Sequence, residues 1–176
     1  MTALSPQPCE DPDCRGRHDP DERVALAVSI CNARGARLTK SRLLILELLW
    51  ENRGPTGAYE LVEALKRRGD RSVGPPTVYR ALEFLIGQGL VSKIESRNAY
   101  IPCAHPERKH LCLFFICGSC GDSTELEDRR LERLISEDAT LLGFRAARRV
   151  VEIEGTCERC WTAGEADPTA NASVKN

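Results

Sequence analysis

The pattern of hydrophobic and polar residues divides the chain into two parts near Pro102. In the first part, apolar residues recur at intervals of three and four in four successive segments, which predicts four helices with one buried face each. Residues 90–95 and 99–101, separated by a polar turn, predict a β-hairpin. Helices followed by such a hairpin are the order of elements that is typical of a winged helix. The predicted inward rows are Val24, Val28 and Cys31; Ile45, Leu48 and Leu49; Leu61, Val62 and Leu65; and Val78, Leu82 and Leu85.

Capping residues mark where these helices begin. The first helix is expected from Glu22 to Arg34, and Thr39 and Thr56 are the predicted N-caps of the second and third helices. The fourth helix is expected to open at Pro75-Pro76-Thr77, because the first turn of a helix does not need the amide that proline lacks. Cys31 lies on an apolar helix face, so we expect it to be a small core residue.

The second part of the chain predicts a small α+β unit. Residues 111–116 and 148–155 predict strands, and between them Asp128 to Leu142 predicts a helix. Such a unit leaves strand edges and apolar surface that a second copy of the chain would cover, so we expect a symmetric homodimer. The inward row of this helix is predicted to be Leu131, Leu134, Ile135 and Leu142.

Charge is distributed unevenly, although the 176-residue chain has a formal net charge of only -1. Six acidic residues gather within residues 1–22, a proline-rich segment that we expect to be a mobile tail. Residues 34–80 hold ten basic residues against five acidic ones, as a phosphate-binding surface would. No run approaches the ~20 apolar residues that span a bilayer and no signal peptide is evident, so we expect a soluble, cytoplasmic protein without a membrane partner.

The predicted helix at Pro76 is the candidate recognition helix, whose first residues would reach base edges in the major groove of DNA. Thr77 and Tyr79 offer hydroxyl groups there, and the guanidinium of Arg80 can bind guanine in a bidentate manner. A place at the edge of the core is the alternative for Tyr79 and for Tyr59. The candidates for phosphate contacts near the starts of the two preceding helices are Lys40, Arg42 and Tyr59.

Four of the nine cysteines form two Cys-x-x-Cys pairs, Cys117 with Cys120 and Cys157 with Cys160. Two such pairs predict a closed tetrahedral site for structural zinc, because Zn²⁺ binds four thiolates without redox chemistry. A dithiol redox motif fits less well, since it occurs once and opens a helix after a strand. We find no nucleophile paired with a base and no open metal position, so we predict neither an enzyme nor a small-molecule substrate.

Three groups of residues are similar to those of a known family. They are Pro75-Pro76-Thr77-Val78-Tyr79-Arg80-Ala81-Leu82, the segment Arg37-Leu38-Thr39-x-x-Arg42, and the two cysteine pairs with Gly121. Over roughly residues 21–163 the chain resembles the ferric-uptake-regulator (Fur) superfamily, and the run from Gly89 to Cys103 resembles its zinc-uptake-regulator branch. The resemblance implies a homodimeric repressor whose zinc-loaded form binds inverted-repeat operator DNA and represses zinc-uptake genes. It also implies one structural and one sensory zinc per subunit.

The resemblance places the sensory site at the hinge between the two domains. Cys103, His110 and Glu125 match three of the four ligands of the zinc branch, whereas Ser92 stands where that branch has a histidine in the wing. We take His105 as the substitute for the missing ligand. The alternatives are Cys112, Glu95, a water molecule, and Cys9, Cys14 or His18 of the tail.

The predicted organisation is α+β with four segments. They are an acidic flexible tail (1–20), a winged-helix DNA-binding domain (21–101), a zinc-binding dimerisation domain (102–163) and a disordered C-terminal tail (164–176). Within the family, an iron or peroxide sensor is the alternative, but it would use histidines and carboxylates without sulfur. Outside the family, the alternatives are a thiol redox protein and a zinc carrier.

Overall fold

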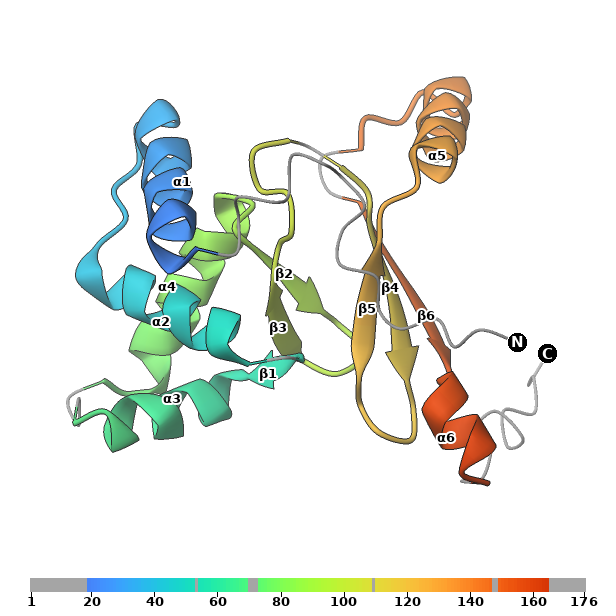
Figure 1. Cartoon of the computed structure of the whole chain (residues 1–176). Helices are drawn as coiled ribbons and strands as arrows, with labels where there is room; N and C mark the ends of the chain where they lie inside the picture. Colours follow the sequence, from blue (N-terminus) through green and yellow to red (C-terminus); the bar gives the residue numbers. More distant parts are fainter. Residues whose placement is uncertain (1–18, 53, 70–72, 109, 147–148, 165–176) are drawn as a thin grey trace. The chain divides into compact units, whose positions relative to one another are not determined.

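The computed structural model describes residues 19–52, 54–69, 73–108, 110–146 and 149–164 (Figure 1). Residues 1–18 of the predicted tail, which include Cys9, Cys14 and His18, lie outside the described residues, as do residues 165–176, whereas residues 19 and 20 open the first helix. The described chain forms two compact units. The first comprises residues 19–52, Thr56–Lys93 and Ala99–Arg108, and the second comprises residues 54–55, Ile94–Asn98 and the described residues from 110 onward. Within these ranges no helix is long and apolar enough to cross a membrane.

Four helices, blue to green in Figure 1, build the first unit. They are α1 (Pro20–Ala33), α2 (Lys40–Glu51), α3 (Ala58–Arg67) and α4 (Pro75–Gly87). Their apolar faces meet in a single core, and the inward rows predicted for α2, α3 and α4 are all buried in it. Leu46 of α2 is also fully buried, although the sequence pattern did not single it out.

Of the inward row predicted for α1, only Cys31 is buried, and Val24 is half-buried. Val28 is 37% exposed, and the buried side chains of α1 are Ala27, Ile30 and Cys31. The helical spacing of three and four is kept, but the face turned inward is the one that carries Ala27, Ile30 and Cys31. Cys31 is a core residue, as predicted.

The N-cap predicted for α3 is also wrong. Thr56 lies in the short strand β1 (Thr56–Gly57), where it pairs with Tyr100 of the antiparallel strand β3 (Ala99–Pro102). The N-cap is Gly57, whose backbone N–H donates a hydrogen bond to the Glu60 carboxylate at 3.1 Å. Glu60, in the first turn of α3, therefore accepts the hydrogen bond of the N-cap amide. Thr56 is not needed as a cap and pairs in the sheet instead.

The predicted hairpin is present as β2 (Val91–Ile94) and β3, which form with β1 a sheet in the order β1-β3-β2. Asn98 closes the turn with a φ of 47°, in the left-handed region that asparagine tolerates better than most residues. Four helices and this small sheet confirm the winged helix. Residues 91–93 and Ala99–Pro102 belong to the first unit, whereas Ile94–Asn98 belongs to the second.

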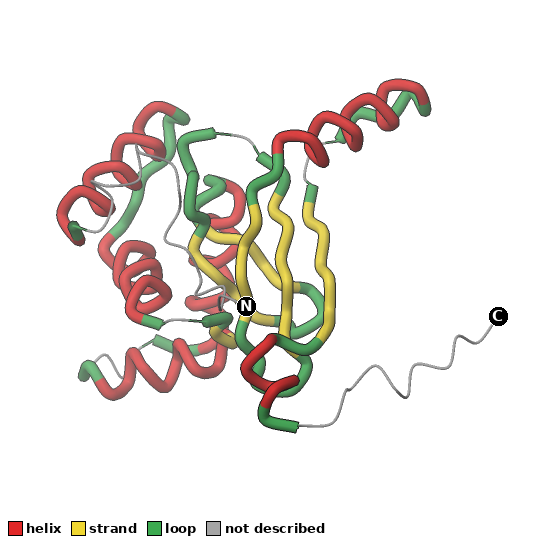
Figure 2. The backbone as a smooth tube through the Cα atoms, turned by 45° about the vertical axis from the view of Figure 1, so that its right-hand side comes forward, coloured by secondary structure: helices red, strands yellow, loops and turns green. Residues whose placement is uncertain are grey.

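The second unit is built on another three-stranded sheet, whose strands run side by side in Figure 2 in the order β5-β4-β6. β4 (Cys112–Cys117) and β6 (Val150–Gly155) are the two predicted strands, and they pair in parallel. β5 (Ser123–Leu126), antiparallel to β4, and the short α6 (Glu158–Thr162) were not predicted. Together with α5 (Arg129–Leu141), whose N-cap is Asp128, the first residue of the predicted helix, they confirm an α+β unit.

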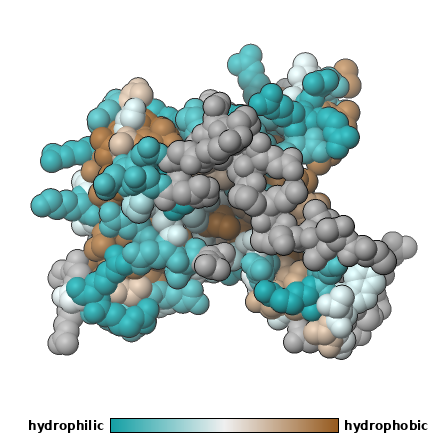
Figure 3. Space-filling view, in the orientation of Figure 1, coloured by the Kyte–Doolittle hydropathy of each residue, from teal (hydrophilic) through white to brown (hydrophobic). Residues whose placement is uncertain are grey.

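No side chain of α5 is buried, so the inward row predicted for this helix is wrong within the single chain. Leu131 and Leu134 are exposed, and so is Leu142 just after the helix. In Figure 3, hydrophobic residues lie among hydrophilic ones on α5. On the sheet, Phe115 of β4 and its register partner Ile153 of β6 are exposed as well. The second unit therefore leaves apolar side chains on both its helix and its sheet without cover from its own chain.

The burial of Leu46 generates a prediction about stability. We expect Leu46→Ala to lower the free energy of unfolding by about 2–5 kcal/mol, because it leaves a cavity in a closed core. Val28→Ala on α1 is the control, and we expect a change of under about 1 kcal/mol at this exposed position. Urea unfolding followed by circular dichroism measures both, and equal losses would contradict the packing described for α1 and α2.

Candidate metal centres and nucleic-acid interface

The parallel pairing of β4 and β6 brings the two cysteine pairs together. Cys117, the last residue of β4, lies opposite Gly155, the last residue of β6. Because paired parallel strands end at the same edge of a sheet, the segments that follow them leave the sheet as neighbours. The backbone N–H of Gly118 donates to the Gly155 carbonyl at 2.8 Å and joins these two segments.

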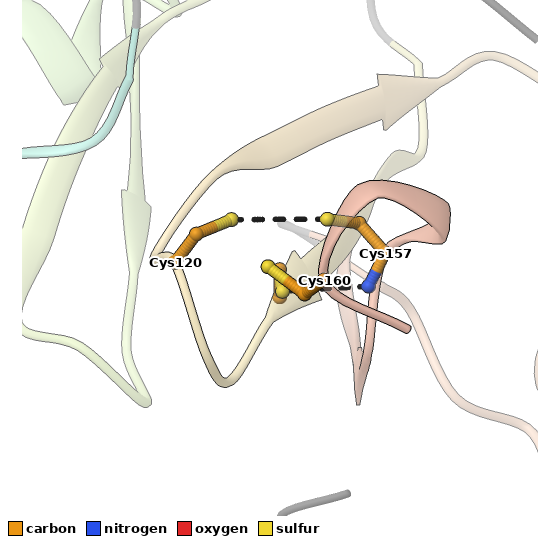
Figure 4. A group of neighbouring side chains, drawn as sticks. Cys120, Cys157 and Cys160 are labelled. Carbon is orange, nitrogen blue, oxygen red and sulfur yellow. Dashed lines mark hydrogen bonds between the residues drawn. The ribbon is translucent and has the colours of Figure 1, made fainter. Parts of the chain in front are cut away.

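Four thiol groups gather at this edge. The sulfur atoms of Cys117, Cys120, Cys157 and Cys160 all lie within 4.8 Å of one another. Figure 4 shows Cys120 facing Cys157 across 3.8 Å, with Cys160 beside them. Gly121 lets the first pair fold back, because its φ of 77° is a conformation that glycine adopts without strain. We call these four cysteines the thiol cluster.

Hydrogen bonds to sulfur stabilise the thiolate form in the thiol cluster. The pKa of Cys117 falls to about 6, chiefly because the Cys120 backbone N–H donates to its sulfur and next because the Cys157 N–H does. The pKa of Cys120 is also lowered, first by the Asp122 backbone N–H and then by the Arg159 guanidinium, whose Nη2 lies 3.4 Å from the sulfur. The thiolate is the form that binds a metal ion.

The donor set of the thiol cluster fits a zinc ion. Sulfurs bound tetrahedrally at a Zn–S distance of ~2.3 Å lie about 3.8 Å apart, which is the separation of Cys120 and Cys157. Four protein sulfurs leave no position for a water molecule, so such a site supports folding and does not perform catalysis. Arg159, which the sequence analysis did not single out, lies between the two cysteines of its pair along the chain and offsets part of the cluster's negative charge.

A second set of metal-binding side chains lies at the beginning of β4. Nε2 of His110 lies 3.2 Å from Oε1 of Glu125, and both side chains are largely buried. Glu125 comes from β5, the strand that the sequence did not predict, where it pairs with Phe114. The sulfur of Cys112 lies 3.8 Å from the same Nε2 of His110. The structure thus brings together two residues predicted for the sensory site and one of the alternatives.

The other residues predicted for the sensory site belong to the first unit. Cys103 follows β3, and its backbone N–H donates to the Leu90 carbonyl at 3.0 Å. His105 is buried, and its Nδ1 lies 3.5 Å from the Glu107 carboxylate. Ser92, at the position where the resemblance expects a histidine, is buried in β2.

The first two turns of α4 present polar side chains to solvent. Thr77 and Arg80 are exposed, as a role in DNA binding requires. Tyr79 is half-buried and packs against the core. It therefore lies at the core edge, which the sequence analysis gave as the alternative for this residue. Two prolines at the first positions of α4 fix the backbone where the helix begins.

The three candidates for phosphate contacts differ in what surrounds them. Tyr59, near the start of α3, is 69% exposed, and Lys40 at the first position of α2 is exposed too. Arg42, in contrast, stacks its guanidinium on the ring of Phe84, 3.5 Å from the ring centroid, and donates to the Arg37 carbonyl at 2.7 Å. Arg42 therefore joins α2 to α4 through a cation–π contact, which its sequence position did not reveal.

Comparison with known families decides what kind of protein has these features. The model of the ferric uptake regulator family matches residues 33–154, which is more than half of the chain. The chain belongs to the ferric uptake regulator family. Similar proteins of this Fur family include the zinc uptake regulation protein of Escherichia coli (strain K12), 39% identical over 140 residues that cover 79% of this chain and 81% of the relative. That of Mycobacterium tuberculosis (strain ATCC 25618 / H37Rv) is 35% identical over 132 residues, 73% of this chain and 98% of the relative.

Solved Fur-family structures support the same assignment. A zinc uptake regulator complexed with zinc and DNA matches with a TM-score of 0.74 and 36% identity, over 83% of this chain and 97% of the other. The crystal structure of holo XcZur matches with a TM-score of 0.70 and 37% identity, over 81% of this chain and 99% of the other. These likenesses confirm the fold class predicted from the sequence.

The thiol cluster of this Fur-family chain generates a prediction about metal content. We expect Cys160→Ser to lose the metal ion of the cluster and to lower the unfolding temperature of the second unit, because the ion joins β4 to the segment after β6. Cys31→Ala, which removes another buried thiol but one outside the cluster, should leave metal content unchanged. Elemental analysis and thermal unfolding measure the two effects. A Cys160→Ser protein that keeps the wild-type metal content would contradict the assignment of the cluster.

Proposed function

We propose that this Fur-family protein is a zinc-responsive repressor, whose zinc-loaded homodimer binds inverted-repeat operator DNA in the cytoplasm and represses genes for zinc uptake. As a Fur-family member, the chain is a metal-responsive DNA-binding regulator and not an enzyme. The observation that carries the proposal is the contact of His110 with Glu125 in a chain that also has the thiol cluster. Relatives named as zinc uptake regulation proteins, and a solved one holding zinc and DNA, support zinc as the metal.

The two metal centres have different roles in this proposal. The thiol cluster holds the structural zinc, because four thiolates bind the ion tightly and leave it no open position. Cys103, His110 and Glu125 hold the regulatory zinc, with His105 retained as the predicted fourth ligand. A site with one sulfur still favours zinc over iron or manganese, while fewer sulfurs than the thiol cluster has make the ion exchangeable.

Cys103 reaches the regulatory site through a short connection. Seven residue steps separate Cys103 from His110, and a chain of that length spans at most ~25 Å. Cys103 belongs to the first unit, whereas His110 and Glu125 belong to the second. Ligands from both units, when they hold one ion, restrict how the winged helix can move relative to the second unit.

This restriction is how the site would regulate DNA binding. Ligands that favour one arrangement by about 5.5 kcal/mol move a two-state equilibrium from 1:99 to 99:1, so a few kcal/mol are enough for a useful response. The favoured arrangement is the one in which both recognition helices of a dimer match their half-sites. Linkage then requires that operator DNA raise the zinc affinity by the same factor.

The recognition helix in this proposal is α4. Exposed Thr77 and Arg80 contact base edges from its first two turns, and half-buried Tyr79 joins them from its place at the core edge. Lys40 and Tyr59 contact phosphates. Arg42 contributes by fixing α2 on α4, and its stacked guanidinium remains a further candidate for a phosphate contact.

The homodimer explains the apolar surface of the second unit. Leu134 of α5 is 56% exposed, and Phe115 and Ile153 of the sheet are exposed as well. Exposed apolar side chains on both a helix and a sheet are typical of a surface that a partner covers. A second copy, related by a two-fold axis, would cover them and present two winged helices to the two halves of an inverted repeat.

Loss of Cys103 tests the regulatory site. We expect Cys103→Ala to reduce the zinc content from about two ions per chain to one and to abolish zinc-dependent DNA binding, with the fold retained. Cys112→Ala is the matched control, because its half-buried thiol lies next to His110 without being a proposed ligand. Elemental analysis and gel-shift titration against free zinc are the measurements. If Cys112→Ala loses the second zinc while Cys103→Ala keeps it, the proposed ligand set is wrong.

Loss of Arg80 tests the recognition helix. We expect Arg80→Ala to weaken binding to the operator by about 1–3 kcal/mol and to leave zinc content unchanged, because it removes a base contact. Lys40→Ala should instead weaken binding to all duplexes equally and reduce the salt dependence, as the loss of a phosphate contact does. Fluorescence anisotropy with operator and random duplexes at several salt concentrations separates the two. Equal losses on both duplexes for Arg80→Ala would remove α4 from its role in base recognition.

A further inference from the structure

The turn of the wing hairpin is held by the second unit. Its strands, β2 and β3, lie mainly in the first unit, but Ile94–Asn98 belongs to the second. Ile94, the last residue of β2, is fully buried. The turn donates hydrogen bonds to residues of β4 and β6, which lie far away along the sequence.

Glu152 binds two consecutive backbone amides of this turn. Its Oε1 accepts from the Glu95 N–H at 2.6 Å, and its Oε2 accepts from the Ser96 N–H at 3.0 Å. Glu152 is half-buried in the middle of β6, where it pairs with Phe114 of β4. A carboxylate that accepts two N–H bonds is held by charge-assisted hydrogen bonds, which are stronger than neutral ones.

Arg97 fixes the same turn at a second point. Its guanidinium donates to the Cys117 carbonyl at 2.8 Å, at the residue that ends β4 and begins the thiol cluster. A Cβ atom added to Gly121 would lie 3.6 Å from Nη1 of Arg97, so the arginine also lies close to the return of the first cysteine pair. The turn is therefore bonded to β6 through Glu152 and to the end of β4 through Arg97.

We infer that Glu152 is a positioning residue for DNA binding, which pins the wing turn to the dimerisation sheet so that the winged helix is pre-organised for its operator. The inference rests on the proposed function. A turn released from Glu152 has more conformations to lose when the winged helix docks on DNA, and this loss of entropy weakens binding. The carboxylate touches neither metal nor DNA in this role, and it acts through the amides of Glu95 and Ser96.

A graded series at position 152 tests the inference. Glu152→Gln keeps the size of the side chain but has one carbonyl oxygen, so it can accept from only one N–H at full strength. Glu152→Ala accepts from neither. Glu154→Ala is the matched control, because Glu154 lies two residues along the same strand and is exposed. Zinc content should equal the wild-type value in all three variants.

The first readout does not involve DNA. In the zinc-loaded protein, we expect the amide hydrogens of Glu95 and Ser96 to exchange about tenfold faster or more in Glu152→Ala, with Glu152→Gln between it and the wild type. Glu154→Ala should exchange at the wild-type rate. Unchanged exchange at both amides in Glu152→Ala would overturn the inference that Glu152 holds the turn.

The second readout is affinity for the operator at saturating zinc. We expect it to fall about tenfold in Glu152→Ala, less in Glu152→Gln, and not at all in Glu154→Ala. If the wild type shows no zinc-dependent DNA binding, the proposed function fails. The exchange measurement still tests whether Glu152 holds the turn. If the wild type binds and Glu152→Ala binds equally tightly despite faster exchange, the positioning role fails and the proposed function stands.

Discussion

The second unit depends on the parallel pairing of β4 with β6. This pairing sets Cys117 opposite Gly155 and so puts both cysteine pairs at one edge of the sheet. The helix α5 adds little core to this sheet, because none of its side chains is buried within the described chain. A small unit with a limited core of its own needs another source of stability, and a metal ion held by the thiol cluster would supply it. Backbone amides that donate to the Cys117 sulfur lower its pKa and so favour the thiolate that binds a metal ion.

The sequence predicted what depends on local periodicity and spacing. The buried rows of α2, α3 and α4 and the hairpin follow from the recurrence of apolar residues, and the thiol cluster follows from two Cys-x-x-Cys pairs. It could not predict β5, because four residues reading Ser-Thr-Glu-Leu carry too short and too polar a pattern to be recognised. Glu125 was therefore placed by resemblance alone, and only its register opposite Phe114 explains how it meets His110. Thr56 was wrongly predicted as a helix N-cap for a related reason, because the two-residue strand in which it lies leaves no periodic signal in the sequence.

Charged side chains were the hardest to interpret from sequence, because their roles are set by neighbours that are distant along the chain. The excess of basic residues between 34 and 80 predicted a phosphate-binding surface, yet part of that charge is used within the first unit. Arg42 stacks on Phe84, Arg34 donates to the Gln88 carbonyl, and Arg68 pairs with Glu51. The sum of charges therefore overstates the surface available to DNA. Lys40 and Arg80 remain exposed.

The same sheet edge serves both metal binding and the wing. Arg97 donates to the carbonyl of Cys117, whose sulfur belongs to the thiol cluster, and Glu152 on the adjacent strand holds the neighbouring part of the turn. Disorder at the cysteine pairs would then loosen the turn that Arg97 anchors, even with the regulatory ligands intact. Under the proposed function, the structural and the regulatory sites are therefore not independent in their effect on DNA binding. In that proposal the thiol cluster gives the wing turn a fixed support, and the regulatory ligands select which arrangement of the two units is populated.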